Sequence, residues 1–377
     1  MFFRLKKVSL LLLVLLLTSC ARPAVEPGAG NKAEYAVPTY TPRPIPTPLP
    51  KNESGEPTLL LRKNIEPYEV VVLRLSTGCL LNGEECNMKG NLLGVLPQSL
   101  SQVLKIYWMS NGDKAFFRDN MGDIYVLDGN QGTFQIFKKQ VLKVRDVFLI
   151  SPNGQNTIFE TQNSDYETDL VLMDNLSGDI SKIDILLPGA KYASQWIDDH
   201  TVLFFNELSE GKGYIIDRRV YTLNTIEQSV QPLDIDRDWM RTSVPVFSPD
   251  SKYMAFTTED GTVLREASNA SEHTLAMSGK NFLWSLDSNF LVIYDSNRQI
   301  YTVLSNGSGL QKVYSLASIE NLEDWLWLPD NIHILLILTD DDGNRQVGIL
   351  SVLDQSFSQL NLSLLQNYEP ISVSYRP

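Results

Sequence analysis

The sequence predicts an all-β protein, a β-propeller of four-stranded blades, and three observations predict this fold class. Six segments share an apolar anchor residue, a turn rich in Ser, Pro, Asp and Asn, and a following run of β-forming residues. The segments recur every 37 to 51 residues, which suits the length of one blade. No stretch has a convincing helical period, and only Val95–Tyr107 is ambiguous. The six anchors are Trp108, Ile150, Trp196, Phe247, Trp284 and Trp327.

Residues 1–19 are predicted to be a lipoprotein signal peptide. Basic residues at positions 4, 6 and 7 precede the apolar run Val8–Leu17, which is shorter than the roughly 20 residues of a membrane-spanning helix. The following Leu17-Thr18-Ser19-Cys20 resembles the lipobox of bacterial lipoproteins. This resemblance implies cleavage before Cys20, acylation of that cysteine, and anchoring in a bilayer on the extracytoplasmic side of a membrane. An ordinary secretory signal with a chance cysteine is the alternative.

Residues 20–57 are predicted to form a Pro- and Thr-rich tether behind the lipidated cysteine. Prolines recur at close intervals from Pro38 to Pro50. Proline fixes φ and removes a backbone donor, so an extended polyproline II segment or simple disorder is expected. Either conformation would hold the predicted propeller domain, residues 58–377, at a distance from the membrane.

Four strands are predicted in each repeat unit. In the unit anchored at Phe247 they cover residues 244–247, 253–258, 262–266 and 272–277, separated by Pro-Asp and Asp-Gly turns. The last segment, 370–375, looks like an inner strand without a following unit. Residues 58–62, 69–76 and 91–96 could supply its three missing strands and close the ring. Seven blades are therefore favoured, and a six-bladed ring with an appended 58–100 segment is the alternative.

A disulfide is predicted between Cys79 and Cys86. Asn82-Gly83 lies midway between the two cysteines and is a strong signal for a type I′ hairpin turn. Such a hairpin would place the two cysteines opposite each other, within disulfide range. An exported protein meets an oxidant more often than a cytosolic one. Two reduced thiols are the alternative.

The repeat sequence also resembles a known family. Phe247-Ser248-Pro249-Asp250-Ser251-Lys252-Tyr253-Met254-Ala255-Phe256 looks like the repeat of TolB-type propellers, which also occurs in the propeller domains of prolyl-oligopeptidase-like enzymes. The resemblance implies a propeller over about residues 58–377. It implies little about function, because the motif consists of turn residues and core anchors. The chain has no Gly-x-Ser-x-Gly nucleophile elbow of the kind that a hydrolase would use.

Charge and motifs narrow the candidate sites. The formal net charge of -13 argues against a nucleic-acid partner. No cofactor and no metal site is predicted: Asp234-Ile235-Asp236-Arg237-Asp238 imitates the start of a calcium loop, but Trp239 stands where that loop needs Gly. The same link between two blades mixes Trp and Arg, the residue types that often dominate interfaces. The candidate partner-binding residues are Asp234, Asp236, Arg237, Asp238, Trp239 and Arg241.

Two classes of function fit these observations. The first is a non-enzymatic binding or scaffold module, tethered by lipid in the cell envelope, whose partner is an envelope protein or a glycan. The second is a carbohydrate-active or metal-assisted enzyme whose site is assembled from loops of several blades. No catalytic residue is assigned, because such a site would come from residues far apart in the chain.

Overall fold

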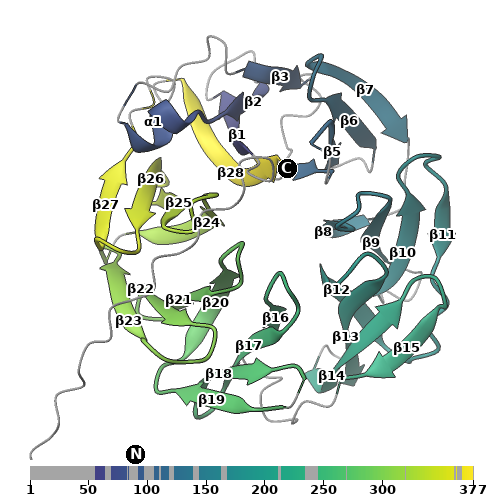
Figure 1. Cartoon of the computed structure of the whole chain (residues 1–377). Helices are drawn as coiled ribbons and strands as arrows, with labels where there is room; N and C mark the ends of the chain where they lie inside the picture. The colour runs from purple at the N-terminus through teal and green to yellow at the C-terminus, as the bar shows by residue number, and fades with distance from the viewer. Residues whose placement is uncertain are drawn as a thin grey trace, which may run out of the picture. The chain divides into compact units, whose positions relative to one another are not determined.

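The computed structural model describes residues 56–63, 69–82, 84, 92–96, 106–109, 112–118, 123–138, 144–162, 168–210, 214–233, 245–268, 270–318, 320–360, 362 and 367–376. These residues form seven four-stranded antiparallel sheets arranged as the blades of a ring (Figure 1). The predicted β-propeller of four-stranded blades is confirmed, with seven blades. In the described part of the chain, no helix is long and apolar enough to cross a membrane.

We number the blades along the chain and give their strands from the centre of the ring outward. Blade 1 contains β28 (Tyr368–Arg376), β1 (Glu56–Lys63), β2 (Val70–Arg74) and β3 (Leu92–Leu96). Blade 2 contains β4 (Tyr107–Trp108), β5 (Lys114–Arg118), β6 (Ile124–Asp128) and β7 (Thr133–Lys138). Blade 3 contains β8 (Val144–Ile150), β9 (Asn156–Gln162), β10 (Thr168–Asp174) and β11 (Ile180–Lys182).

The other four blades follow the same order. Blade 4 contains β12 (Ala190–Trp196), β13 (Thr201–Glu210), β14 (Tyr214–Asn224) and β15 (Ser229–Pro232). Blade 5 contains β16 (Val246–Phe247), β17 (Tyr253–Thr258), β18 (Gly261–Glu266) and β19 (Glu272–Leu275). Blade 6 contains β20 (Gly279–Trp284), β21 (Phe290–Asp295), β22 (Gln299–Leu304) and β23 (Gln311–Ser315). Blade 7 contains β24 (Asn321–Trp327), β25 (His333–Thr339), β26 (Arg345–Ser351) and β27 (Ser356–Gln359).

Blade 1 closes the ring by combining strands from the two ends of the domain. β28 pairs antiparallel with β1, so that Val373 lies opposite Leu59. The predicted closure is confirmed, and the six-bladed alternative is wrong. Two side chains of other blades hold the closing sheet: Asp324 of blade 7 accepts the N–H of Val373 at 3.0 Å, and the indole Nε1 of Trp108 in blade 2 donates to Thr58 Oγ1 at 2.9 Å.

The hydrophobic core lies between neighbouring blades. In β25 the run Ile334–Leu338 is buried without interruption, because blades cover both faces of this sheet. Leu335 and Ile337 belong to the cluster shared with blade 1, whereas Leu336 belongs to the cluster shared with blade 6. Successive side chains of one strand thus fill opposite interfaces.

The tryptophan anchors link blades as well as filling the core. Trp196 Nε1 donates to the Leu149 carbonyl at 2.9 Å, and Trp284 Nε1 donates to the Val246 carbonyl at 3.0 Å. Trp327 is almost fully buried, and its Nε1 donates to a carbonyl of blade 6. Each of these three indoles reaches the inner strand of the preceding blade.

One predicted element is wrong. The segment around Cys79 is not the first strand of a hairpin but the short helix α1 (Thr77–Leu81). The Ser76 side chain caps this helix by accepting the N–H of Cys79, and the N–H of Asn82 donates to the Gly78 carbonyl. Cys79 and Leu80 pack in the cluster between blades 7 and 1, so burial favours a helix where the local Asn-Gly signal favours a turn.

Candidate functional site

One face of the ring carries most of the tight turns. Successive strands of a blade are antiparallel, so the first turn (between the first two strands) and the third turn (between the last two) lie on the same face. We call this the turn face. The links between blades and the second turns lie on the opposite face, which we call the link face.

A repeated hydrogen-bond pattern shapes the first turns. In blade 5, Ser248 Oγ donates to Asp250 Oδ1 at 2.7 Å and accepts the N–H of Tyr253 at 3.0 Å. In blade 6, Ser285 Oγ donates to Asp287 Oδ1 at 2.6 Å and accepts the N–H of Phe290 at 2.9 Å. The Ser and Asp residues of the repeat that predicted the fold therefore stabilise the turn itself. The carboxylate accepts hydrogen bonds from groups of its own turn.

Neighbouring first turns are also bonded to one another. The N–H of Asp250 in blade 5 donates to Ser288 Oγ of blade 6 at 3.0 Å. The N–H of Leu286 in blade 6 donates to Asn331 Oδ1 of blade 7 at 3.0 Å. Ser251 Oγ of blade 5 donates to the Ile197 carbonyl of blade 4 at 2.7 Å. From blade 4 to blade 7 the turn face is thus held together by contacts between adjacent turns.

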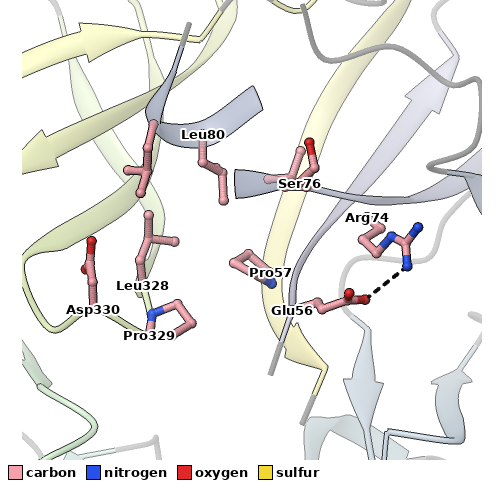
Figure 2. A pocket seen from close by; sticks show the side chains of 10 residues that line it. Glu56, Pro57, Arg74, Ser76, Leu80, Leu328, Pro329 and Asp330 are labelled. Atoms are coloured by element: carbon pink, nitrogen blue, oxygen red, sulfur yellow. Dashed lines mark hydrogen bonds and ion pairs between the residues drawn. The ribbon is translucent and has the colours of Figure 1, made fainter. Parts of the chain in front are cut away.

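The turn face is hollowed between blades 7 and 1. A pocket of about 560 Å³ lies between the first turn of blade 7 and the segment that joins β2 to α1 (Figure 2). β28 and β1 come from distant parts of the sequence, so no tight turn connects them as it does in the other blades. The lining residues are Glu56, Pro57, Arg74, Leu75, Ser76, Leu80, Leu81, Leu328, Pro329 and Asp330.

The lining combines an aliphatic floor with a polar rim. Leu80 and Leu328 are buried and belong to one core cluster, whereas Leu81 is 44% exposed. Glu56 and Arg74 form an ion pair of 3.5 Å on the blade 1 side, drawn as a dashed line in Figure 2. The arrangement can hold an apolar side chain from another molecule or from another part of this chain, with polar contacts at the edge.

Asp330 forms the opposite rim. Its Oδ1 accepts the N–H groups of Ile332 and His333 at 2.9 and 3.0 Å, and its Oδ2 lies 2.6 Å from Nδ1 of His333. Burial opposes ionisation of this carboxyl, but the hydrogen bonds from the His333 ring and from the two backbone groups outweigh burial and hold the pKa of Asp330 below its usual value. Asp330 is therefore a fixed carboxylate.

A second group of ionisable side chains lies near the link face, between blades 3 and 4. The buried Lys191 Nζ is 3.4 Å from Asp169 Oδ1, and Lys182 Nζ is 3.0 Å from the other oxygen of that carboxylate. The hydrogen bond and charge of Asp169 raise the pKa of Lys182. Nearby, the buried Glu160 accepts the N–H of Ala193 at 2.9 Å. These contacts join the inner strand of blade 4 to blade 3.

Most residues singled out from the sequence lie outside the described part of the chain. This holds for Cys20, for Cys86 and for the whole link from Asp234 to Arg241. The signal peptide, the lipid anchor, the tether, the Cys79–Cys86 disulfide and the partner-binding role of that link stay predictions. Among the described residues, no group of three His, Cys, Asp or Glu is placed to hold a metal ion.

The pocket was not foreseen from the sequence. Its walls come from residues 56–57, 74–81 and 328–330, which the ring closure brings together. One signal was available: a blade completed by distant strands cannot have a tight turn between its first two strands. The predicted closure therefore already marked the place where the turn face would be open.

Comparison with known proteins supports the fold alone. An oligogalacturonate lyase from Vibrio parahaemolyticus is 12% identical, and the match covers 81% of this chain and 86% of the lyase with a TM-score of 0.55. The tricorn protease is 11% identical over 82% of this chain but 33% of its own, with a TM-score of 0.54. TolB from Acinetobacter baumannii is 14% identical over 87% and 68% of the two chains, with a TM-score of 0.49. No protein-family model and no curated protein sequence matches the chain.

Proposed function

We propose that the protein is a lipid-anchored, extracytoplasmic β-propeller that acts as a non-enzymatic binding or scaffold module in the cell envelope. The pocket between blades 7 and 1 is the site that receives its partner. The observation that carries this proposal is the aliphatic floor of Leu80 and Leu328, open to solvent at the half-exposed Leu81. A concave apolar surface with a few fixed polar groups is the usual form of a binding site.

The lining favours a protein partner over a glycan. Four leucines and two prolines line the pocket, together with one ion pair and one fixed carboxylate. Aliphatic side chains gain free energy by covering apolar groups of a partner, at about 25 cal/mol per Å² removed from water. The anchor residue of the partner is therefore an aliphatic side chain, with a cationic or amide group beside Asp330.

Site-specific photocrosslinking in cells tests this proposal. A photoreactive phenylalanine analogue placed at Leu81 should crosslink a discrete envelope protein. Leu176 is the matched control, because it is 92% exposed on a third turn of the same face, in blade 3. Leu186, 91% exposed on the link face, tests the alternative docking side. Adducts formed at Leu186 and not at Leu81 would contradict the assignment to the pocket.

The enzyme alternative rests on the ionisable cluster near the link face. Buried charged groups are arranged at many active sites, and Lys191, Asp169 and Glu160 lie at one blade junction. The fold is shared with an oligogalacturonate lyase, so oligogalacturonides are the first substrates to assay. Turnover by the wild type that is lost in a folded Lys191→Met variant would favour this second function. Absence of turnover in the wild type would leave Lys191 with a structural role, through the ion pair that joins blade 4 to blade 3.

A further inference from the structure

We propose that the rim of the turn face at blades 3 and 4 contacts a lipid bilayer, with the side chains of Leu176 and Ile226 inserted among zwitterionic lipids. This inference rests on the lipid anchor of the function proposed above, and it needs no occupant of the pocket between blades 7 and 1. It gives the anchored domain an orientation in which that pocket, on the other side of the ring, stays open to a partner (Figure 1).

The third turns of blades 3 and 4 carry largely exposed aliphatic side chains at their tips. Leu176 is 92% exposed and Ile226 is 68% exposed, and each lies two residues after the third strand of its blade. A single exposed leucine is common on protein surfaces. Here two aliphatic tips lie on the same face of neighbouring blades, which together make a larger apolar contact (Figure 1).

The corresponding tips of three other blades are polar. Two residues after the third strand stand Asn130 in blade 2, Ser268 in blade 5 and Asn306 in blade 6, all of them exposed. In blade 7 this position holds Leu353, which is only 36% exposed. Among these tips, the largely exposed aliphatic ones are therefore those of the adjacent blades 3 and 4.

Side chains at the ends of the third strands fix the backbone of both tips. Asp174 Oδ1 accepts the N–H of Leu176 at 2.9 Å, and Asn224 Oδ1 accepts the N–H of Ile226 at 3.0 Å. The two turns thus use the same contact at the same position, and they present their aliphatic side chains in the same way.

The residue before each tip ties the third turn to the first turn of its blade. Asn175 Nδ2 donates to the Gly154 carbonyl at 2.9 Å, and Thr225 Oγ1 donates to the His200 carbonyl at 3.1 Å. Both of these polar residues are buried. A tip that is held in this way loses little conformational freedom when it meets a surface, so less of the free energy of burial is spent on ordering it.

The path of the chain directs the turn face towards the predicted anchor. β1 begins at Glu56 on the turn face, so the tether predicted before it joins the domain on the face that carries Leu176 and Ile226. An extended tether of residues 20–55 would reach roughly 110 Å at most, which lets either face contact the bilayer. The anchor thus supplies a high effective concentration of lipid, and the aliphatic tips select the face that binds.

The charges beside the tips favour zwitterionic over anionic lipids. Asp174 and Glu227 adjoin the two tips, and Asp179 follows in the third turn of blade 3. The hydrogen bonds from the N–H groups of Ser177 and Leu176 hold the pKa of Asp174 below its usual value, so this group is a carboxylate at neutral pH. Carboxylates are repelled by anionic headgroups, whereas the ammonium group of phosphatidylethanolamine attracts them.

Photocrosslinking of the full acylated chain in vesicles tests the inference without a protein partner. A photoreactive phenylalanine analogue at Leu176 or at Ile226 should form lipid adducts in vesicles of phosphatidylethanolamine and phosphatidylcholine, detected by mass spectrometry. Leu186 is the control matched for exposure, because it is 91% exposed on the link face, and Ser268 is the control matched for position in the third turn. Neither control should exceed the background. Addition of phosphatidylglycerol should lower the yield at Leu176, and an increase would overturn the preference for zwitterionic lipid.

Substitutions at one tip test whether the two tips insert together. Ile226→Ser should lower the insertion equilibrium, read from the lipid adducts at Leu176, by about tenfold, the factor that corresponds to the burial of one aliphatic side chain. Ile226→Val keeps an aliphatic tip and should retain most of the yield. An unchanged yield at Leu176 in Ile226→Ser would show that the tips do not act as one contact.

The outcomes separate this inference from the proposed function. A chain that is not acylated at Cys20 and does not float with the vesicles would overturn the anchor, and this inference with it. An anchored chain whose lipid adducts at Leu186 or Ser268 equal those at Leu176 would overturn the inference alone. Lipid adducts confined to Leu176 and Ile226 would support it, whatever protein crosslinks at Leu81 in cells. A protein adduct at Leu176 in cells, without lipid adducts in vesicles, would assign the tips to a protein partner instead.

Discussion

Two neighbouring junctions of the ring, between blades 6 and 7 and between blades 7 and 1, differ in their contacts. Each junction brings together the inner strands of two blades and the ends of those blades on the turn face. Between blades 6 and 7, Trp327 reaches an inner-strand carbonyl and Asn331 accepts an N–H of the neighbouring first turn. Between blades 7 and 1, the contact between inner strands comes from Asp324, which binds Ser372 and Val373 of β28. The turn face is open there, and the pocket lies at the position where the neighbouring junction has a contact between first turns.

The difference shows what a noncovalent closure demands. In the other six blades a tight turn joins the first two strands, because one contiguous segment of the chain forms both of them. Blade 1 must align strands from distant parts of the sequence, and polar side chains assist at the end of β28 on the link face. Tyr368 donates to Glu69 at 2.5 Å, and Arg62 pairs with Glu369. Polar side chains therefore help to align the two segments that form blade 1.

Removing the closing strand should have the largest effect. Deletion of residues 370–377 removes most of β28, exposes the edge of β1, and uncovers the Leu59 and Leu61 side of the core. We expect a loss of more than about 4 kcal/mol in unfolding free energy, or aggregation. Thermal unfolding followed by circular dichroism measures this. A truncated domain that melts at the wild-type temperature would show that β28 does not close the ring.

Asp324→Ala should destabilise the closing junction by about 2 kcal/mol. The substitution leaves the N–H of Val373 without its acceptor and removes the partner of the Ser372 hydroxyl. Denaturant unfolding gives the value. The neighbouring Glu323→Ala is the control, because that side chain makes only a partly exposed, 4.0 Å ion pair with Arg345 and should change stability by less than about 0.5 kcal/mol. Equal effects of the two substitutions would argue against a special role for Asp324.

Tyr368→Phe should lower the free energy of unfolding by about 1.5 kcal/mol at neutral pH. It should also change how that free energy depends on pH in alkaline solution. Burial and the hydrogen bond to Glu69 raise the pKa of Tyr368 to about 12 from 10.0. A raised pKa means that the neutral phenol is favoured in the folded state, so its contribution is complete below pH 10 and is lost as the pH rises toward about 12. Between pH 10 and 12 the free energy of unfolding, measured by denaturant titration at each pH, should fall more steeply for the wild type than for the variant. An equal dependence on pH in the two proteins would exclude the contribution of Tyr368.

Ser288→Ala should have the smallest measurable effect of these changes, about 1 kcal/mol, because it removes one contact between first turns. Leu81→Ser at the open junction should change the unfolding free energy by less than about 0.5 kcal/mol, since Leu81 is half-exposed. The pair compares a filled junction with an open one. A large loss from Leu81→Ser would mean that the pocket is part of the core and not a binding surface.

The strands and the number of blades could be predicted because their signals are local. Tyr253–Thr258 has the predicted bounds, since turn residues on both sides limit this run of β-forming residues. The closure was also predictable, because an unmatched inner strand at one end of the domain implied three unmatched strands at the other. For these features, the pattern of each segment carries the information.

The helix α1 and the pocket depended on tertiary structure. Asn82-Gly83 favours a hairpin locally, but packing of Cys79 and Leu80 against Leu328 makes a helix the better solution. The predicted closure marked where the turn face would be open, but the lining of the pocket could not be predicted, because the closed ring brings Glu56 to the turn that contains Asp330. The sequence determined where each strand and turn forms, since those choices depend on neighbouring residues. Only the closed ring decided which side chains line the open junction, because that lining brings together residues some 270 positions apart.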